Sequence, residues 1–335
     1  MTARSARLRT AVLCWGAAAF FGGFAPAWSA ATPVNAAPAP APAGVKSPLP
    51  PDTAPPLLIN LDRFDASKRS AHLANGIDLS YIDTGNPKGR PVLLIHGYTD
   101  NARDWVPLIP HLDKTDRLIL VDIRGHGASA KPDCCYARLD FAYDLKLLLD
   151  HLHVQHADVV GHSLGSIIAQ TLAEYWPERV RRVVLIASTG GPRKGAPAKP
   201  PSFDFVSEIK KLKEPIDPDS PFMIAWWDSP KPVNAEFIRR QRRDAAGIPL
   251  RVWLAVIDQG LTGDDLQATL PWLKAPVLLL WGSDDPIMEE GVRQTLREAL
   301  PAAQVKIFAG LGHNPFWEDP QQVAAAINGF LHEPR

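Results

Sequence analysis

Apolar residues along this chain fall into two alternating patterns. Patterns typical of strands, most of them continuous apolar runs, cover residues 77–83, 91–95, 117–121, 157–160, 180–187, 277–281 and 305–308. Patterns typical of helices cover residues 103–112, 139–152, 167–175, 290–299 and 320–331. Continuous apolar strands separated by helices indicate a sheet covered on both faces. We therefore expect a doubly wound α/β fold with a mostly parallel sheet.

Residues 191–271 interrupt this alternation, because they contain proline-rich stretches and helical pieces but little strand pattern. We expect a helical cap there, inserted into an α/β core formed by residues 58–190 and 272–335. An insertion of this kind covers the carboxyl ends of the strands, where open α/β sheets bind ligands. Phe222, Trp226 and Trp227 either line a substrate pocket or attach the cap to the core.

The amino terminus has the pattern of a secretory signal peptide. Three arginines precede an apolar run at residues 11–24, and small residues follow it. The run is short for a bilayer span and is broken by glycine and proline, so cleavage is favoured over an uncleaved anchor. We expect a signal peptide at residues 1–31, an Ala/Pro-rich linker at 32–57, and a secreted or periplasmic protein without a stable membrane span.

Composition narrows the classes of partner. The chain has 335 residues, 46% hydrophobic and 21% charged, with a formal net charge of +0. Such a chain can bury a sizeable core, and it has no basic stretch interleaved with aromatic residues. We expect a small-molecule substrate, no nucleic acid and no cofactor. The oligomeric state is not encoded in any pattern that we identify.

Cysteine and histidine spacing predicts no metal site, because no cluster has the spacing of metal ligands. Cys14 leaves with the signal peptide. Cys134 and Cys135 are adjacent, and two alternatives remain open for them in an exported chain. They are either two unpaired, partly buried thiols or a strained disulfide ring between neighbours.

The pentapeptide Gly161-His162-Ser163-Leu164-Gly165 follows one apolar run and opens an amphipathic one. Serine on a sharp strand-to-helix turn, with glycine two residues to either side, is typical of a nucleophile elbow. The glycines are needed because strand and helix approach so closely that a Cβ atom would clash. Ser163 is therefore the predicted nucleophile.

A serine hydroxyl needs a base and a group that orients the base. His313 is the predicted base, because it follows a strand and glycines precede it in its loop. Asp285 is the predicted acid, and its neighbour Asp284 is the rival. Two backbone amides are needed for the oxyanion, and Leu164 and Tyr98 are the predicted donors.

Five motifs occur in the order that a known superfamily requires. They are Leu94-Ile95-His96-Gly97-Tyr98, Asp122-Ile123-Arg124-Gly125-His126-Gly127-Ala128-Ser129, the Ser163 elbow, the segment 281–286, and the segment 310–320 with Glu318. The chain resembles the α/β-hydrolase superfamily, near its esterase, lactonase and cofactor-free perhydrolase members. The resemblance implies a structural role for the Arg124 loop. His96 is expected to be structural rather than catalytic, with a place beside the substrate pocket as the alternative.

The predicted function is an exported serine hydrolase that cleaves a small carboxylic ester, lactone or thioester through an acyl-enzyme. Serine at the elbow argues against haloalkane dehalogenases and epoxide hydrolases, which use aspartate there. A C–C bond hydrolase, an amidase similar to proline iminopeptidases, and a non-catalytic binding protein of the same fold remain alternatives.

Overall fold

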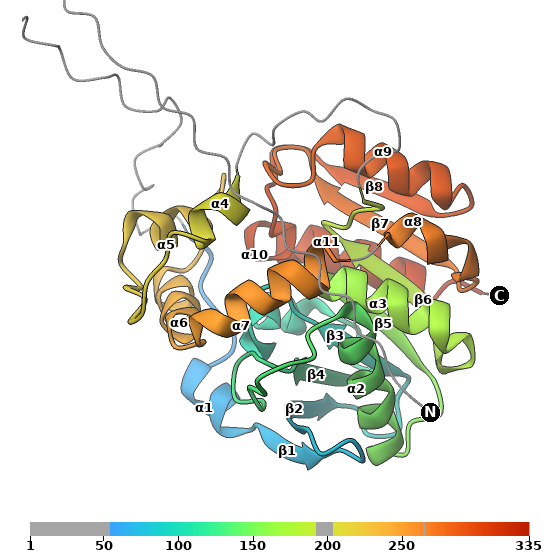
Figure 1. Ribbon diagram of the computed structural model, residues 1–335. Coiled ribbons are helices and arrows are strands. Elements are labelled where there is room, and N and C mark those ends of the chain that lie inside the picture. The colour runs from blue at the N-terminus through green and yellow to red at the C-terminus, as the bar shows by residue number, and fades with distance from the viewer. Residues whose placement is uncertain (1–53, 192–203, 264, 335) are drawn as a thin grey trace, which may run out of the picture. The chain divides into compact units, whose positions relative to one another are not determined.

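The computed structural model describes residues 54–191, 204–263 and 265–334. The predicted signal peptide and most of the predicted linker lie outside them. The centre of this structure is an eight-stranded sheet (Figure 1). In order across the sheet, the strands are β1 (Arg69–His72), β2 (Asp78–Gly85), β4 (Arg117–Asp122), β3 (Pro91–Ile95), β5 (Ala157–His162), β6 (Val180–Ile186), β7 (Val277–Gly282) and β8 (Gln304–Phe308).

The pairing of these strands is mixed. β1 and β2 pair antiparallel, β2 pairs antiparallel with β4, and all other neighbours pair in parallel. Every residue of β5 and β7 is buried, which explains their uninterrupted apolar pattern. The expected doubly wound, mostly parallel α/β sheet is confirmed.

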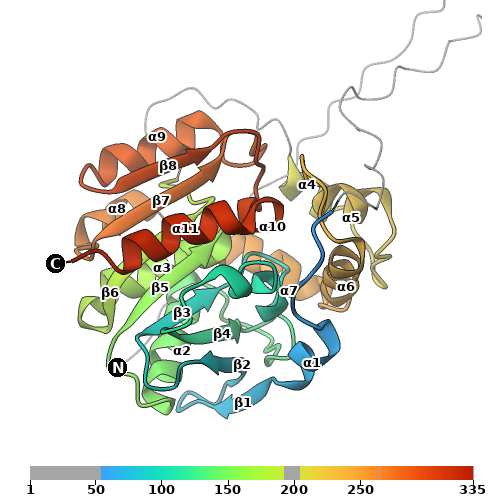
Figure 2. The ribbon, with the colours of Figure 1, turned by 180° about the vertical axis from the view of Figure 1, so that it is seen from behind.

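Helices cover both faces of the sheet. α2 (Arg138–His151) and α3 (Leu164–Tyr175) pack together on one face (Figure 1), and α11 (Pro320–Leu331) crosses the opposite face (Figure 2). The other helices of the core are α1 (Leu61–Ala66), η4 (Pro177–Arg179), α9 (Glu290–Ala299) and α10 (Pro315–Glu318). No helix among the described residues is long and apolar enough to cross a membrane.

The helix predicted over residues 103–112 is wrong. Two short 3₁₀ helices, η2 (Ala102–Trp105) and η3 (Ile109–His111), replace it. Pro107 and Pro110 lack the amide hydrogen that a continuous helix requires at these positions. The pattern also missed β1, an edge strand with one buried residue in four, where periodicity carries little signal.

The predicted cap region contains helices and turns in its described residues. They are α4 (Phe205–Ile209), α5 (Pro221–Trp226), α6 (Ala235–Ala246), α7 (Leu250–Ala255), η5 (Val256–Leu261), α8 (Leu266–Thr269) and η6 (Leu270–Trp272). Side-chain oxygens of Ser220 and Asn234 accept hydrogen bonds from the first turns of α5 and α6. The exact boundaries between core and cap stay predictions.

Polar contacts join this region to the loop after β3. The Tyr98 hydroxyl donates to the Trp253 carbonyl at 2.8 Å, and Arg103 forms an ion pair of 2.7 Å with Asp244. β3 lies between β4 and β5 in the sheet. The chain therefore crosses from β3 to β4 on one side, and later from β4 to β5 on the other side of β3. Loops at such a switch point diverge, which opens space above the strand ends.

Candidate active site

The backbone at Ser163 is strained. Ser163 lies between β5 and α3 with φ +49° and ψ −118°, which L-residues rarely adopt. A Cβ atom on Gly161 would lie 2.2 Å from the Gly165 carbonyl oxygen, and one on Gly165 would lie 2.2 Å from the Ile95 carbonyl oxygen. These distances are far below van der Waals contact, so glycine is required at both positions. The close approach that the pentapeptide predicts is present.

Asp285 and His313 are joined. Nδ1 of His313 lies 2.9 Å from Oδ2 of Asp285, while Oδ1 accepts from the amides of Ile287 at 2.8 Å and Met288 at 2.9 Å. Burial alone raises the pKa of Asp285, but His313 and the two amides outweigh it and lower that pKa to about 2. The carboxylate is therefore ionised at neutral pH and only accepts hydrogen bonds.

This pairing sets the tautomer of His313. Because Asp285 only accepts, Nδ1 of His313 donates, which leaves a lone pair on Nε2. Burial lowers the pKa of His313, but the charge and hydrogen bond of Asp285 outweigh it, and the pKa lies above its usual value. The rival Asp284 is exposed and accepts instead from the Ser283 hydroxyl at 2.6 Å.

The His313 loop is attached to the residue before Ser163. Nε2 of His162 donates to the His313 carbonyl at 3.0 Å, and the two rings lie 5.1 Å apart between centroids. Among the described residues, no hydrogen bond joins the Ser163 hydroxyl to the His313 ring. Catalytic hydrogen bonds are often long in free enzymes and shorten when substrate binds. The catalytic roles of the three residues stay predictions.

The two predicted oxyanion donors come from backbone segments in contact. Leu164 begins α3, and a Cβ on Gly165 would lie 2.4 Å from the His96 carbonyl oxygen, two residues before Tyr98. Among the hydrogen bonds of the described residues, none uses the amide of Leu164 or of Tyr98 as donor. An oxyanion hole requires amides in this state. Their role also stays a prediction.

His96 is buried, with both ring nitrogens in hydrogen bonds to backbone. Nε2 accepts from the Ile123 amide at 3.1 Å, so Nδ1 carries the hydrogen and donates to the Gly97 carbonyl at 2.7 Å. Burial lowers the pKa of His96 to about 4, so the ring is neutral. These contacts support the structural role. Arg124 is likewise paired with buried Asp144, at 2.5 Å.

The cap aromatics contact the predicted oxyanion loop. The Trp226 indole donates to the Thr99 hydroxyl at 3.0 Å and packs edge-on against Tyr98, with centroids 6.0 Å apart. Phe222 stacks on Trp226 at 5.9 Å, and Trp227 is buried beside it. Trp226 therefore attaches the cap to the core, while lining of a substrate pocket stays a prediction for all three.

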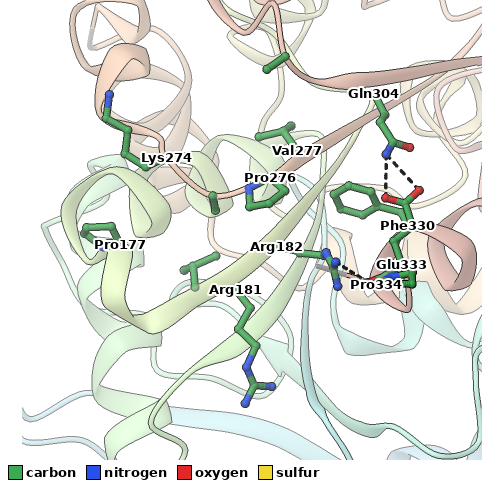
Figure 3. A pocket seen from close by; sticks show the side chains of 13 residues that line it. Pro177, Arg181, Arg182, Lys274, Pro276, Val277, Gln304, Phe330, Glu333 and Pro334 are labelled. Atoms are coloured by element: carbon green, nitrogen blue, oxygen red, sulfur yellow. Dashed lines mark hydrogen bonds between the residues drawn. The ribbon is translucent and has the colours of Figure 1, made fainter.

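A cavity of about 590 Å³ lies at the other end of the sheet, among the first residues of β6, β7 and β8 (Figure 3). Its walls include Arg182, Pro276 and Phe330, and Gln304 donates to Glu333 across one side at 2.9 and 3.1 Å. Ligands of open α/β sheets bind at the carboxyl ends of strands, so this cavity is not the expected substrate site.

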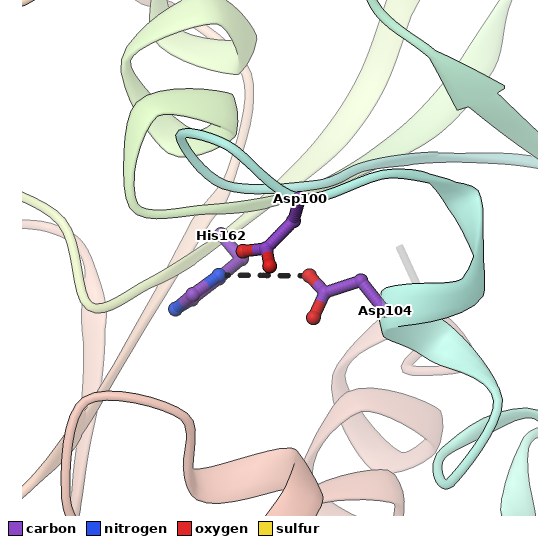
Figure 4. A group of neighbouring side chains, drawn as sticks. All are labelled: Asp100, Asp104 and His162. Carbon is purple, nitrogen blue, oxygen red and sulfur yellow. Dashed lines mark ion pairs between the residues drawn. The ribbon is translucent and has the colours of Figure 1, made fainter. Parts of the chain in front are cut away.

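The sequence analysis left one feature open and did not detect another. Exposed Cys134 and Cys135 form a disulfide, so the structure selects the ring between neighbours. Asp100, Asp104 and His162 form a buried group beside His313 (Figure 4), which cysteine and histidine spacing did not reveal. The group brings together a loop and a strand end that are distant along the chain, so no local pattern signals it.

Comparison with known proteins gives consistent likenesses. The family model described as alpha/beta hydrolase fold matches residues 90–320. The chain is 29% identical to a 2-hydroxy-6-oxononadienedioate/2-hydroxy-6-oxononatrienedioate hydrolase of Paraburkholderia phymatum, over 75% of this chain and 90% of that protein.

Two esterases are also similar. The chain is 28% identical to a pimeloyl-[acyl-carrier protein] methyl ester esterase of Nitrosomonas europaea, over 73% of this chain and 96% of that protein. The crystal structure of an esterase from Rhodococcus sp. ECU1013 has a TM-score of 0.68 and 25% identity, covering 79% of this chain and 98% of that chain.

Proposed function

The chain belongs to the α/β hydrolase fold family, and from this premise we propose that it is an exported serine hydrolase acting on a small carboxylic ester, lactone or thioester. The observation that carries the proposal is the hydrogen bond between His313 and Asp285, on a loop attached at His162 to the strained turn of Ser163. The similarity to two esterases supports the ester class of bond.

In the proposed mechanism, protons move in a defined order. Nε2 of His313 carries the lone pair that accepts the proton of the Ser163 hydroxyl as the oxygen attacks the substrate carbonyl. The imidazolium that forms is stabilised by ionised Asp285 and then gives its proton to the leaving alcohol or thiol. The amides of Leu164 and Tyr98 donate to the developing oxyanion, and water activated by His313 later hydrolyses the acyl-enzyme.

Substitution of the nucleophile tests this mechanism. We expect Ser163→Ala to lower kcat for p-nitrophenyl acetate by roughly 10⁵–10⁶-fold with an unchanged melting temperature, since nucleophile and base act as a unit. Ser70→Ala, on exposed edge strand β1, is the matched control and retains full activity. Undiminished turnover by purified Ser163→Ala would refute the mechanism.

A second candidate is cleavage of a C–C bond, which the likeness to the Paraburkholderia phymatum hydrolase favours. A panel of p-nitrophenyl esters, lactones, β-diketones and amino-acid anilides separates the bond classes. We expect esters or lactones to exceed the others in kcat/KM. A higher kcat/KM for β-diketones assigns the chain to C–C cleavage instead.

Export is proposed from the charged, apolar and small-residue regions of the first 31 residues. Expression of the full chain in a Gram-negative host, followed by fractionation and amino-terminal sequencing, tests it. We expect the mature protein in the periplasm, beginning at about residue 30 to 32. An intact amino terminus in the cytoplasmic fraction contradicts the proposal.

A further inference from the structure

Three buried side chains beside the candidate active site point hydrogen-bond acceptors at one another. Asp100 and Asp104 lie in the segment after β3, and His162 ends β5 (Figure 4). One ligand atom from each lies within 4.8 Å of the other two, and Oδ2 of Asp104 is 3.7 Å from Nδ1 of His162. Their exposed fractions are 6%, 0% and 1%, so the group is shielded from bulk water.

Each of the three has a buried atom without a hydrogen-bond partner among the described residues. These atoms are Oδ1 of Asp100, Oδ2 of Asp104 and Nδ1 of His162. Burying a polar atom without a partner is costly, and native proteins leave few such atoms. Three of them at one place could be satisfied together by a single bound cation.

Hydrogen bonds behind the group orient it as a ligand set. Nε2 of His162 donates to the His313 carbonyl, so its hydrogen is on Nε2 and Nδ1 presents a lone pair. The Trp317 indole donates to Oδ1 of Asp104 at 2.8 Å, which turns Oδ2 toward His162. Metal-binding histidines and carboxylates are oriented by outer hydrogen bonds of this kind.

The backbone of Gly97 packs directly against the group. A Cβ atom there would lie 2.9 Å from Nδ1 of His162 and 3.1 Å from Oδ2 of Asp100, too close for any side chain. Trp227 and Gln241 approach Asp100 from the cap, and the Gly97 amide faces Asp104. Oδ1 of Asp100, Oδ2 of Asp104 and Nδ1 of His162 nevertheless keep no hydrogen-bond partner among the described residues.

The two neighbouring carboxyls also need compensation for their burial. Buried acids of this kind are costly unless protons or a cation neutralise them. A cation would in addition satisfy the three unpartnered atoms at once.

We propose that Asp100, Asp104 and His162 bind a divalent transition-metal cation of the Zn²⁺ or Mn²⁺ class. One imidazole nitrogen with two carboxylate oxygens suits these ions, whereas Mg²⁺ and Ca²⁺ prefer oxygen ligands throughout. Bound there, the ion joins the predicted oxyanion loop to the residue that precedes Ser163. Its role is to hold the segment after β3 against the end of β5, and it takes no part in the steps of the proposed hydrolysis.

Zn²⁺ is the probe for the test. The purified mature protein is treated with a chelator and dialysed against Zn²⁺, and bound metal is measured by mass spectrometry. We expect about one equivalent of zinc, and at a hundredfold excess over Kd a melting temperature raised by roughly 5 °C or more. Replacement by Co²⁺ gives a visible absorption band that reports nitrogen and oxygen ligands.

Two substitutions locate the site. Asp104→Asn and Asp100→Asn each remove one charged ligand, and we expect each to weaken Zn²⁺ binding on the order of 100-fold and to abolish the rise in melting temperature. Asp158→Asn is the matched control. Asp158 is also buried, and its oxygens accept no hydrogen bond among the described residues, although Arg90 lies 3.5 Å away. It is the second residue of β5, at the opposite end of that strand from His162. The control variant retains wild-type binding.

The outcomes are decisive in either direction. Less than a tenth of an equivalent of Zn²⁺ or Mn²⁺ on the wild-type protein, with no thermal shift, overturns the proposal. Binding that survives both substitutions at the cluster also overturns it, because the metal then lies elsewhere. If one variant does not fold, the other and the Co²⁺ spectrum still decide. Ser163→Ala binds Zn²⁺ normally, so failure of the proposed hydrolysis is distinguishable.

Discussion

Two groups of carboxylate and imidazole side chains lie next to one another in this molecule, and they differ in how their charges are satisfied. Asp285 receives three hydrogen bonds, from His313 and two backbone amides. Asp100 and Asp104, close to His162, keep inward oxygens without partners. Both groups are buried, so burial alone does not explain the difference.

The partner beside each carboxyl accounts for the difference in pKa. The charge of His313, together with its hydrogen bond and two backbone amides, lowers the pKa of Asp285 to about 2 despite its burial. Burial dominates at Asp100 and Asp104 and raises the pKa of each. The first group therefore keeps a permanent charge that orients a base. The second keeps inward oxygens without partners, and this is where we propose that a cation binds.

The largest expected effect comes from removing the satisfied charge. Asp285→Asn keeps the shape of the side chain but reverses the tautomer of His313, so we expect kcat for an ester substrate to fall by about 10⁴-fold. Asp284→Asn, one residue earlier and exposed, is the matched control and changes kcat less than about twofold. Equal losses in the two variants would mean that the acid is assigned to the wrong residue.

A third carboxyl, that of Glu318 at the end of α10, extends the comparison to a poorly satisfied acid that contacts the His313 loop. Both of its oxygens share the single amide of Gly312 at 3.0 Å, and burial raises the pKa of Glu318 to about 7. The folded state keeps the proton that the unfolded state loses above pH 4.5. Stability from this group is therefore present below pH 4.5 and is lost as pH rises to about 7.

The expected loss is about 3 kcal/mol in the free energy of unfolding. It is measured by urea denaturation of wild type and Glu318→Gln at pH values between 5 and 8. The variant keeps an oxygen for Gly312 but cannot titrate, so the difference between the two proteins isolates Glu318. A difference that does not vary with pH contradicts the raised pKa.

The smallest expected effect is the acid limb of Asp285, which has the opposite sign. Because its folded pKa of about 2 lies below the usual 3.8, its contribution is present above pH 3.8 and is lost as pH falls through 2. We expect about 2 kcal/mol of stability to disappear over this range in the wild type. Asp285→Asn has no such loss, and parallel acid-denaturation curves for the two proteins would be evidence against the lowered pKa.

Local pattern was sufficient wherever neighbours along the chain determine the structure. Buried strands such as β3 and β7 follow from continuous apolar runs, and α9 and α11 begin and end where their spacing predicts. The turn at Ser163 follows from its flanking glycines, whose missing Cβ atoms allow strand and helix to touch. The preference for Asp285 over Asp284 also came from local spacing, and the structure pairs Asp285 with His313.

The local pattern failed where prolines interrupt a helix and where it carries no information on local conformation. Helical spacing at residues 103–112 did not account for two prolines, which divide the segment into 3₁₀ turns. The disulfide between Cys134 and Cys135 was one of two alternatives. The sequence does not show whether the backbone at these two residues brings their sulfur atoms together.

What the sequence by itself determined is therefore the order of strands and helices, the elbow and the residues predicted to form the triad. Only the tertiary structure decided that Asp100, Asp104 and His162 meet, that Trp226 attaches the cap to Thr99, and which carboxyls are satisfied. The reason is physical: hydrogen-bond partners and desolvation depend on residues brought together by the sheet, and such neighbours leave no periodic trace along the chain.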